Sequence, residues 1–516
     1  MRPALQSALY FARTLRGIEA AYADEPLMQR AGLAAASLAE SLVLPNRRHV
    51  LILVGPGNNG GDAIEAAIHL LTQGHDVNVV YRDDPSRLPP DAQLAHKRFA
   101  SIGGKLEADW PVGQARDYGL IIDGLFGIGL NDNPRNHHAQ WINDANNLAR
   151  DQRVPLLALD CPSGLQGDSG VVFEPAIHAS HCITFLAAKP GLYTLNGPDH
   201  CGEITLADLG VDCASHTAPD GRLLRADDIH MLARKRNCHK GDFGALAILG
   251  GARGMLGAAV LAARSALHCG AGSVYVSTPD ESMQPTLDPL QPELMWRRPV
   301  DLWSMSSSTI KAIVCGPGLG QDKAARSLLD KCLQQNLPLV LDADALNLLA
   351  MHNSLQQAIA NRQATSNHTL LTPHPKEAAR LLDCELQKIQ TDRIAAACQL
   401  ARQYNAHVAL KGCGTIIATP SGKWRINPAG NPGMACAGMG DVLAGAVGAL
   451  IAQDLTAERA LATAVYTHAA AADQLVNSGT GPVGLTASEL IPGMRLQINA
   501  LHCQSRTSHT DSYSMG

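Results

Sequence analysis

The stretch NPGMACAGMGDVLAGAVGALIA, residues 431–452, decides the fold of the second half of the chain. Three glycines lie close together in it, and an apolar run with helical spacing opens at Asp441, so we expect Asp441 in the first turn of a buried helix. The free N–H groups of a helix N-terminus suit an anion such as a phosphate, and glycine lets that anion approach the backbone. A carboxylate fits there if it takes a proton from a hydroxyl that attacks a phosphoryl group. The alternative is that Asp441 only caps the helix.

Composition favours an enzyme of two or three domains. The chain has 516 residues, is rich in Ala and Gly, and has only 4% aromatic residues, which is typical of α/β enzymes with close packing of helices on sheets. A net charge of -5 and the absence of a long Lys/Arg run argue against binding to nucleic acid. The 13 cysteines include no Cys-x-x-Cys pair, which predicts a reducing, cytoplasmic setting. No apolar run approaches the roughly 20 residues of a membrane helix, so we expect no membrane association.

In the first half, residues 49–71 (HVLILVGPGNNGGDAIEAAIHLL) predict a strand, a glycine turn and a helix from about Asp62. Residues 77–81 predict the next strand, which completes a βαβ unit. The turn is not a plain dinucleotide fingerprint, because Asn58 and Asn59 stand where such turns have small residues. Amide oxygens there suit a hard cation or the polar groups of a ligand, although the turn could also merely cap the helix.

Two further predicted strands end in a carboxylate. LIID ends at Asp123 and LLALD ends at Asp160. In a doubly wound sheet ligands bind outside the carboxyl ends of the strands, so we expect both carboxylates beside the turn at Asn58 and Asn59. Ser163 lacks the Gly-x-Ser-x-Gly elbow of a nucleophile and is a candidate to lend an oxygen to a cation.

These motifs, GPGNNGGDA, DGLFGIGL followed by PR, and DCPSG followed by D-x-G, resemble the NAD(P)H-hydrate epimerase domain over residues 1–212. The resemblance implies a Rossmann-like three-layer domain that interconverts the R and S forms of hydrated NADH or NADPH (NADHX and NADPHX) and binds K⁺. By position, the K⁺ ligands would be Asn59, Asp123 and Ser163, and the acid/base group would be Asp160. The hydrate would contact Asn58, Asn59, Gly60, Gly61, Asp62, Gly127, Ile128, Gly129, Leu130, Asn131, Asp132, Asn133 and Asp160.

Residues 213–222 are polar and turn-rich, so we expect a linker there, a second domain over 223–500 and a disordered tail over 501–516. Strands alternate with helices through the second domain, which predicts a mostly parallel sheet. The strand LVLDAD (339–344) carries two carboxylates at its end, and such acidic strand ends are candidates to hold Mg²⁺.

Two loops of the second domain suggest a ligand site. His374 lies between two prolines, which restrict its backbone, and its role is equally open to a structural and a functional interpretation. Residues 411–415 (KGCGT) supply a positive charge, two glycines and a hydroxyl, which suit nucleotide phosphates although this is not a Walker loop.

The motifs KGDFG, MLGAAVLAARSAL, CGPGLG, LDADALNLL, TPHP, LKGCGT and NPGM with GMGDVLAG resemble the ribokinase-like superfamily and, more closely, the ADP-dependent NAD(P)H-hydrate dehydratases over residues 223–500. The resemblance implies ADP as co-substrate, with Asp441 as the catalytic base that makes the hydrate attack the β-phosphoryl group. Hydrate contacts would come from Ala258, Gly318, His374 and Asp441. Nucleotide contacts would come from Lys411, Gly412, Cys413, Gly414, Thr415 and Gly440.

Three positions depart from the family pattern, because small residues are expected where Lys376 stands and Ser-Gly where Cys436 and Ala437 stand. Two other interpretations stay open. The second half could be an ATP-dependent kinase of a vitamin-precursor alcohol, or the first half a non-catalytic binding or dimerisation module. The partners we expect are small molecules (NADHX, NADPHX and ADP) and a second copy of the chain, in a homo-oligomer that would use apolar faces of the second half.

Overall fold

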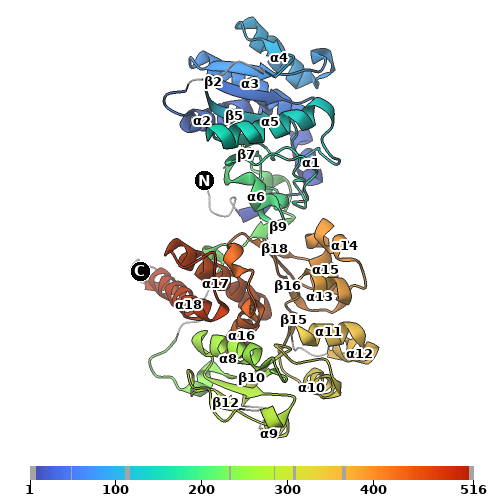
Figure 1. Ribbon diagram of the computed structural model, residues 1–516, viewed down its shortest axis with the longest axis vertical. Helices are drawn as coiled ribbons and strands as arrows, with labels where there is room; N and C mark the ends of the chain where they lie inside the picture. Colours follow the sequence, from blue (N-terminus) through green and yellow to red (C-terminus); the bar gives the residue numbers. More distant parts are fainter. Residues whose placement is uncertain are drawn as a thin grey trace. The chain divides into compact units, whose positions relative to one another are not determined.

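The computed structural model describes residues 7–47, 49–110, 117–229, 231, 234–283, 285–305, 309–362 and 368–510. The chain divides into two compact units, Met1–Arg222 and Leu223–Gly516 (Figure 1). Each unit is an α/β domain with its own sheet, so the predicted fold class is confirmed. No helix in the described ranges is long and apolar enough to cross a membrane.

The sheet of the first unit has the strand order β4-β3-β2-β5-β6-β7-β8, and every pair in it is parallel. Parallel strands need crossovers, and here helices supply most of them. The strands are β2 (His49–Val54), β3 (Asp76–Val80), β4 (Leu106–Glu107), β5 (Tyr118–Gly124), β6 (Leu156–Leu159), β7 (His181–Phe185) and β8 (Glu203–Ala207). The helices are α1 (Ala12–Ala21), α2 (Leu27–Leu42), α3 (Asn58–Thr72), α4 (Pro90–Ser101), α5 (Asn136–Gln152) and α6 (Gly197–Cys201).

Helices cover both faces of this sheet, which confirms the three-layer prediction. Alternate residues of β2 enter two different cores: Ile52 packs with α2, α3 and α4, whereas Leu51 and Leu53 pack with α5. A strand buried on both faces reads as a continuous apolar run, which is why the pattern of residues 50–54 predicted it correctly.

Helix α3 begins at Asn58, four residues earlier than the predicted start at Asp62. Gly57 precedes it with an extended backbone. The four residues Asn-Asn-Gly-Gly have low helix propensity, yet they form the first turn because the glycines pack closely against neighbouring elements. The two asparagines therefore lie on the helix and not in a loop.

Gly60 is one of these close-packed positions. A Cβ atom there would lie 2.0 Å from the carbonyl oxygen of Gly55. We therefore expect Gly60→Ala to lower the free energy of unfolding by about 1–3 kcal/mol, the usual cost of overpacking. Urea unfolding measures it, with Gly17→Ala in α1 as control, because no atom lies within 4 Å of a Cβ at Gly17. Equal stability of the two variants would contradict the close approach.

The segment predicted as a linker is structured within the first unit. Helix α7 (Cys213–His216) buries the Cys213 side chain, and His216 Nε2 lies 2.7 Å from the Tyr22 hydroxyl. Asp220 accepts a hydrogen bond from the Phe11 N–H, and β9 (Gly221–Leu223) pairs antiparallel with β1 (Ala8–Leu9). The polar residues of segment 213–222 thus make local contacts. Composition does not reveal such contacts, which is why it predicted a linker.

The sheet of the second unit runs in the order β18-β17-β16-β15-β14-β13-β10-β11-β12. Its pairs are parallel from β12 to β16, and β17 and β18 add antiparallel pairs, which confirms the mostly parallel sheet. The strands are β10 (Ala245–Leu249), β11 (Ser273–Ser277), β12 (Met295–Trp296), β13 (Ile310–Cys315), β14 (Leu339–Leu341), β15 (Thr369–Leu371), β16 (His407–Leu410), β17 (Thr415–Ala418) and β18 (Trp424–Asn427).

One face of this sheet packs against α8, α16, α17 and α18 in a large apolar core (Figure 1). These helices are α8 (Leu256–His268), α16 (Met439–Ala452), α17 (Ala457–Asn477) and α18 (Ala487–Thr510). The remaining helices are α9 (Pro299–Ser304), α10 (Lys323–Leu333), α11 (Asp344–Met351), α12 (Asn353–Arg362), α13 (Pro375–Leu381), α14 (Leu386–Thr391) and α15 (Arg393–Gln403).

Helix α18 corrects the prediction of a disordered tail from residue 501. The helix continues to Thr510, and Leu501 is buried in the core of the second unit. The polar Ser/His composition that suggested disorder therefore belongs largely to a helix. Residues 511–516 lie outside the described residues.

Candidate functional sites

Helix α16 starts where its sequence predicts. Gly438 precedes the helix with a φ of 90°, a left-handed conformation that favours glycine, and Asp441 lies in the first turn. Twelve of the fourteen residues of α16 are buried. The packing of this apolar helix fixes the position of its N-terminus. The first N–H groups of such a helix have no acceptor within the helix, and they suit a phosphoryl group.

Lys411 lies beside this helix start. Its Nζ lies 2.7 Å from Asp342 Oδ1, and a Cβ at Gly440 would lie 3.0 Å from the same Nζ. Burial lowers the pKa of Lys411, but the Asp342 carboxylate outweighs it and holds that pKa above its usual value, so the side chain is cationic. Asp342, Lys411, Gly440 and Asp441 thus form one cluster, although they come from three separate elements.

The pKa of Asp441 is raised to about 7, first by burial and then by the negative charges of Asp342 and Asp344, against the opposing effect of Lys411. A carboxylate with a pKa near neutrality is suited to accept a proton in one step and release it in another. A simple helix cap needs no such shift. The environment of Asp441 therefore favours the catalytic interpretation over the capping one.

His374 has a structural role that the sequence left open. It caps α13, where its Nδ1 accepts hydrogen bonds from the N–H groups of Lys376 at 3.0 Å and Glu377 at 3.3 Å. Burial, followed by the charge of Lys411, lowers the pKa of His374 and keeps the ring neutral. The nearby charges of Lys411 and Asp342 place His374 at the edge of the same cluster.

The other predicted residues of the second unit lie in three places. Gly318 approaches Ala258, because a Cβ at Gly318 would lie 3.1 Å from the Ala258 Cβ. Residues 411–414 form the tight turn between β16 and β17, in which Cys413 is exposed. Thr415 Oγ1 donates to the Gly412 carbonyl oxygen at 3.1 Å, so its hydroxyl is used within the turn.

Arg393, which the sequence did not single out, supports this site together with the two carboxylates that it did. The buried Arg393 donates to the carbonyl oxygens of Leu410 and Lys411 at 3.3 Å, which holds the turn in place. Asp342 is the ion-pair partner of Lys411, whereas Asp344 accepts from the Gly320 N–H at 2.9 Å. The two carboxylates, predicted together at one strand end, therefore separate: β14 ends at Leu341, and Asp344 begins α11.

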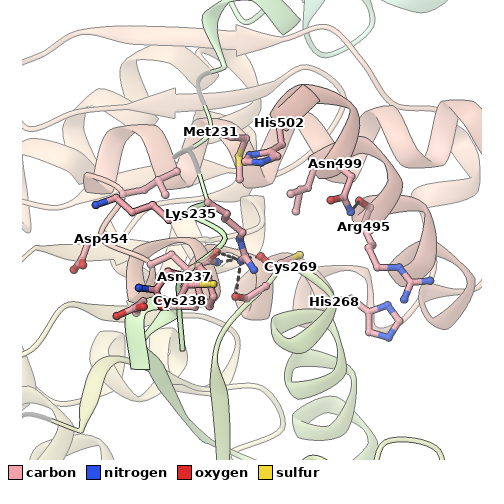
Figure 2. Close-up of a pocket in the computed structure, with 17 residues that line it drawn as sticks. Met231, Lys235, Asn237, Cys238, His268, Cys269, Asp454, Arg495, Asn499 and His502 are labelled. Carbon is pink, nitrogen blue, oxygen red and sulfur yellow. Dashed lines mark hydrogen bonds between the residues drawn. The ribbon is translucent and has the colours of Figure 1, made fainter. Parts of the chain in front are cut away.

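The second unit also has a hollow of about 600 Å³ whose lining carries both Lys/Arg side chains and carboxylates. Figure 2 shows its labelled residues, among them Lys235, Arg495 and His502. None of the residues predicted to bind hydrate or nucleotide is among those that line it. It is therefore separate from the Asp441 cluster.

The first unit has a cavity of about 950 Å³ at the carboxyl ends of its strands. Most of the predicted hydrate-binding residues line it: Asn58, Asn59, Asp62, Gly127, Ile128, Gly129, Leu130, Asn131, Asp132, Asn133 and Asp160. Gly60 and Gly61 do not line it. Gly60 packs against Gly55, and Gly61 packs against Met28 and Ala92.

Asp160 follows β6 with a φ of 63° and forms an ion pair with Lys189. Lys189 is 1% exposed and also donates to Thr184 Oγ1 at 2.8 Å and to the Phe185 carbonyl oxygen at 2.9 Å. Burial lowers the pKa of Lys189, but the Asp160 carboxylate outweighs it and raises that pKa above its usual value. A buried ammonium with three acceptors thus keeps Asp160 in one orientation.

Asp62 provides a contrasting carboxyl group in the same cavity. Burial, followed by the charges of Asp160 and Glu19, raises the pKa of Asp62 well above its usual value. Burial and the charge of Asp160 also raise the pKa of Glu19, which lines the cavity from α1. The cavity therefore places Asp160 next to two carboxyl groups whose pKa is raised.

Of the predicted K⁺ ligands, Asn59 lines this cavity, whereas Asp123 and Ser163 are buried and do not line it. Asn59 is 7% exposed, and neither its amide oxygen nor its amide nitrogen has a hydrogen-bond partner in the described part of the chain. Ser163 Oγ lies 2.7 Å from Asp123 Oδ1, and both side chains are fully buried. Burial raises the pKa of Asp123 to about 6. Amide, hydroxyl and carboxylate oxygens are the donors a hard cation prefers, and the orphaned amide of Asn59 fits such a ligand.

Comparison with known proteins agrees with this two-part architecture. A family model described as the N-terminus of YjeF-related proteins matches residues 24–191, and one described as NAD(P)H-hydrate dehydratase matches residues 246–492. The two matches and the two sheets define a two-domain α/β enzyme. The chain belongs to the family of bifunctional NAD(P)H-hydrate repair enzymes.

Relatives in that family align over most of their length. The bifunctional NAD(P)H-hydrate repair enzyme Nnr of Escherichia coli is 37% identical over 480 residues, which cover 92% of this chain and 89% of that protein. The Nnr of Coxiella burnetii is 37% identical over 511 residues, 96% of this chain and 100% of that protein. A solved ADP/ATP-dependent NAD(P)H-hydrate dehydratase from Bacillus subtilis is 28% identical and covers 54% of this chain and 98% of its own, with a TM-score of 0.48.

Proposed function

We propose that the chain repairs hydrated NADH and NADPH in two steps: the first unit interconverts the R and S hydrates, and the second dehydrates the S hydrate with ADP. The observation that carries this proposal is the Asp441 cluster, in which a carboxyl group with a pKa of about 7 lies at a helix N-terminus beside a cationic lysine. The same chain carries the Asp160 cavity in its first unit, so each unit has a site for one of the two steps.

In the second unit, Asp441 takes the proton from the hydroxyl on C6 of the S hydrate. That oxygen attacks the β-phosphorus of ADP, the bond from this phosphorus to the bridging oxygen breaks, and AMP leaves. The N–H groups at Gly438–Gly440 and the charge of Lys411 stabilise the transferring phosphoryl group. Phosphate then leaves C6 while a proton leaves C5, so that the C5–C6 double bond forms and the dihydronicotinamide ring is restored. Phosphate leaves more easily than hydroxide, which is why the nucleotide is consumed.

Mg²⁺ fits this site through carboxylate oxygens such as those of Asp342 and through the phosphates of ADP. A divalent ion usually takes few protein ligands in such sites and several from phosphate and water. When bound, it would neutralise phosphate charge. The chain's own contribution is to position Asp441, Lys411 and the start of α16 around the reacting atoms.

In the first unit, Asp160 takes the proton of the hydroxyl on C6 while the bond from C6 to ring N1 breaks, which leaves an aldehyde, and Lys189 orients Asp160. Asp62, whose pKa is raised, donates a proton to N1. Rotation about the C5–C6 bond and attack of N1 on the other face of the aldehyde re-form the ring, and both protons return. The alternative, a non-catalytic first unit, does not account for an orphaned buried amide and a buried ion pair that converge on one cavity.

K⁺ at Asn59, Asp123 and Ser163 would fix the floor of that cavity. We expect replacement of K⁺ by Li⁺ in the buffer to slow epimerisation and to leave dehydration of purified S hydrate unchanged. Asn59→Ala should abolish this dependence, whereas Asn58→Ala, its neighbour in the cavity wall, should keep it. The measurement is the epimerisation rate of the wild type and of the two variants in K⁺ and in Li⁺ buffer. A wild-type epimerisation rate that is equal in both salts would contradict the K⁺ site.

The dehydratase rate should depend on pH through Asp441. Its raised pKa means that the base form is half populated at about pH 7, so kcat should fall about tenfold for each pH unit below that and level off above it. The measurement is kcat at saturating ADP and S hydrate across this range. Burial also raises the pKa of Glu377 to about 7, so Glu377→Gln is the control and should keep the profile. A profile that is flat through pH 7 in the wild type would remove the base assignment.

Nucleotide use separates this proposal from an ATP-dependent alcohol kinase, which the Asp441 cluster alone also fits. With S hydrate and ADP, the products should be AMP, phosphate and NAD(P)H in equal amounts. Formation of a stable phosphorylated alcohol from ATP, without phosphate release, would support the kinase instead.

We further propose that the enzyme works in the cytoplasm as a homo-oligomer. Support for the compartment comes from the 13 cysteines, which form no disulfide in the described part of the chain. Disulfide-free chains of this cysteine content suit a reducing compartment.

A further inference from the structure

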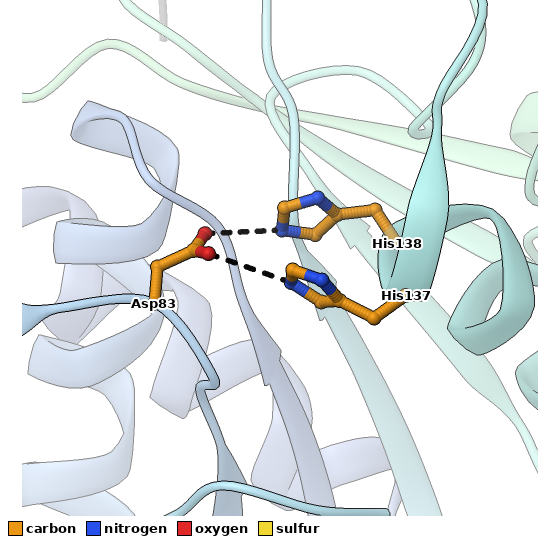
Figure 3. A group of neighbouring side chains, drawn as sticks. All are labelled: Asp83, His137 and His138. Carbon is orange, nitrogen blue, oxygen red and sulfur yellow. Dashed lines mark ion pairs between the residues drawn. The ribbon is translucent and has the colours of Figure 1, made fainter.

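Three side chains of the first unit converge outside the residues assigned above. Asp83 follows β3, and the adjacent His137 and His138 lie in the first turn of α5. Figure 3 shows both imidazole rings with a nitrogen directed at the same carboxylate. His137 Nε2 lies 3.8 Å from Asp83 Oδ1, and His138 Nε2 lies 3.7 Å from Asp83 Oδ2. The three ligand atoms all lie within 4.8 Å of one another.

The contacts of these groups do not explain their position. The two imidazole side chains are only 17% and 12% exposed, and neither Nε2 atom has a hydrogen-bond partner among the described residues. Distances of 3.7–3.8 Å from nitrogen to oxygen are too long for hydrogen bonds. Buried polar atoms that lack partners are rare and often mark an absent ion or water.

Packing holds the two imidazole rings in this arrangement. The ring centroids of His137 and His138 lie 4.0 Å apart, and the His137 ring lies 4.7 Å from the Trp141 ring. An imidazole nitrogen binds a metal ion through its lone pair. The ring edges of Phe126 and Trp141 pack against His138 at centroid distances of 5.1 and 5.8 Å and restrict its orientation.

We propose that Asp83, His137 and His138 bind a divalent transition-metal ion of the Zn²⁺ class. With ligand bonds of about 2.0–2.1 Å, a tetrahedral ion separates its ligand atoms by about 3.3 Å. The nitrogen–oxygen separations of 3.7 and 3.8 Å need to shorten by about half an ångström, and any pair near the 4.8 Å limit by about 1.5 Å, which side-chain rotation can supply. Two imidazoles and one carboxylate favour Zn²⁺ over Mg²⁺ or K⁺, which prefer oxygen ligands. Three protein ligands leave a fourth position for water or for a group of a bound ligand.

The site joins two parts of the cavity wall. Asp83 belongs to the segment after β3, whereas His138 lines the cavity and follows the loop 127–133 that carries hydrate-binding residues. A bound ion therefore fastens the start of α5 to the end of β3 and orders this loop from one side. It is distinct from the K⁺ position, because the two sets of ligands share no residue.

The test uses untagged full-length protein, stripped with a chelator and dialysed. Zn²⁺ affinity is measured by competition with a chromophoric chelator, and Co²⁺ serves as the spectroscopic probe of coordination. Asp83→Asn and His137→Gln are compared with Asp84→Asn, the adjacent carboxylate whose Oδ1 accepts from the Ser86 N–H, and with His178→Gln, an exposed histidine. Circular dichroism confirms that every variant is folded.

We expect one equivalent of Zn²⁺ in the wild type and both controls, with the visible Co²⁺ absorption of a low-coordinate nitrogen site. Asp83→Asn and His137→Gln should weaken binding at least about tenfold. Zn²⁺ should also slow amide exchange over residues 126–138 in the wild type and not in Asp83→Asn. Absence of stoichiometric Zn²⁺ binding in the wild type would overturn the proposal. Wild-type affinity for Zn²⁺ in the Asp83→Asn and His137→Gln variants would also overturn it, because the ion would then bind elsewhere, for example at exposed cysteines.

Discussion

The Asp441→Asn variant should bind ADP as the wild type does and lose about a thousandfold in dehydratase kcat, the usual contribution of a general base. Asparagine keeps the size of the side chain and its place in the first turn of α16 but cannot accept the proton. The N–H groups of the helix start and the Lys411–Asp342 pair remain to hold the phosphates. Calorimetry measures ADP binding, and AMP formation measures kcat.

The matched control is Asp454→Asn. Asp454 lies just beyond the end of the same helix, is exposed, and has a φ of 66° that asparagine also tolerates. It should keep full activity. An Asp441→Asn enzyme that turns over within tenfold of this control would show that Asp441 only caps the helix.

The Asp160→Asn variant should leave a mixture of hydrates only partly repaired. The S fraction is dehydrated at the wild-type rate, and the R fraction returns only as fast as it epimerises without catalysis. General acid/base residues contribute about 10²–10⁴-fold, so epimerisation should become hard to detect. Recovery of reduced-nicotinamide absorbance with time resolves the two phases.

Retained dehydration of the S fraction shows in the same sample that the second unit of this variant works. Asp151→Asn, an exposed carboxylate at the end of α5, controls for loss of a charge in the first unit. A second variant, Lys189→Met, removes the cation that orients Asp160 and should also slow epimerisation. Complete, equally fast repair by Asp160→Asn would exclude Asp160 from catalysis.

The sequence predicted those parts of the sites that lie within one strand–loop–helix unit. The strand before Asn58 and the helix after Gly438 follow from continuous apolar runs, and the residues at their ends follow from chain order. The strand ends at Asp123 and Asp160 met at one edge because parallel strands all end there.

The partners that tune these residues were not predictable in the same way. Lys189 stands in the segment after β7 without a motif, and its pairing with Asp160 depends on the order of strands in the sheet. Glu19 reaches the cavity from the first helix of the chain. The cluster of Asp83 with His137 and His138 joins positions more than fifty residues apart. Such contacts are set by the packing of distant elements, which a local pattern does not encode.

The two asparagines and two glycines before Asp62 show a second limit. Their low helix propensity predicted a loop, but close contacts of the glycines with Gly55 and Met28 outweigh that propensity and extend α3 to Asn58. As a result, Gly60 and Gly61 serve packing, while Asn58, Asn59 and Asp62 face the cavity.

The most direct test of the whole account is recovery of NADPH from an epimer mixture of its hydrate, followed with ADP, with ATP and without nucleotide. We predict rapid recovery of the entire mixture with ADP, accompanied by one AMP and one phosphate for each NADPH, and no recovery without nucleotide. Recovery of only the S fraction would contradict an active epimerase in the first unit. Absence of recovery with either nucleotide would contradict the repair function itself.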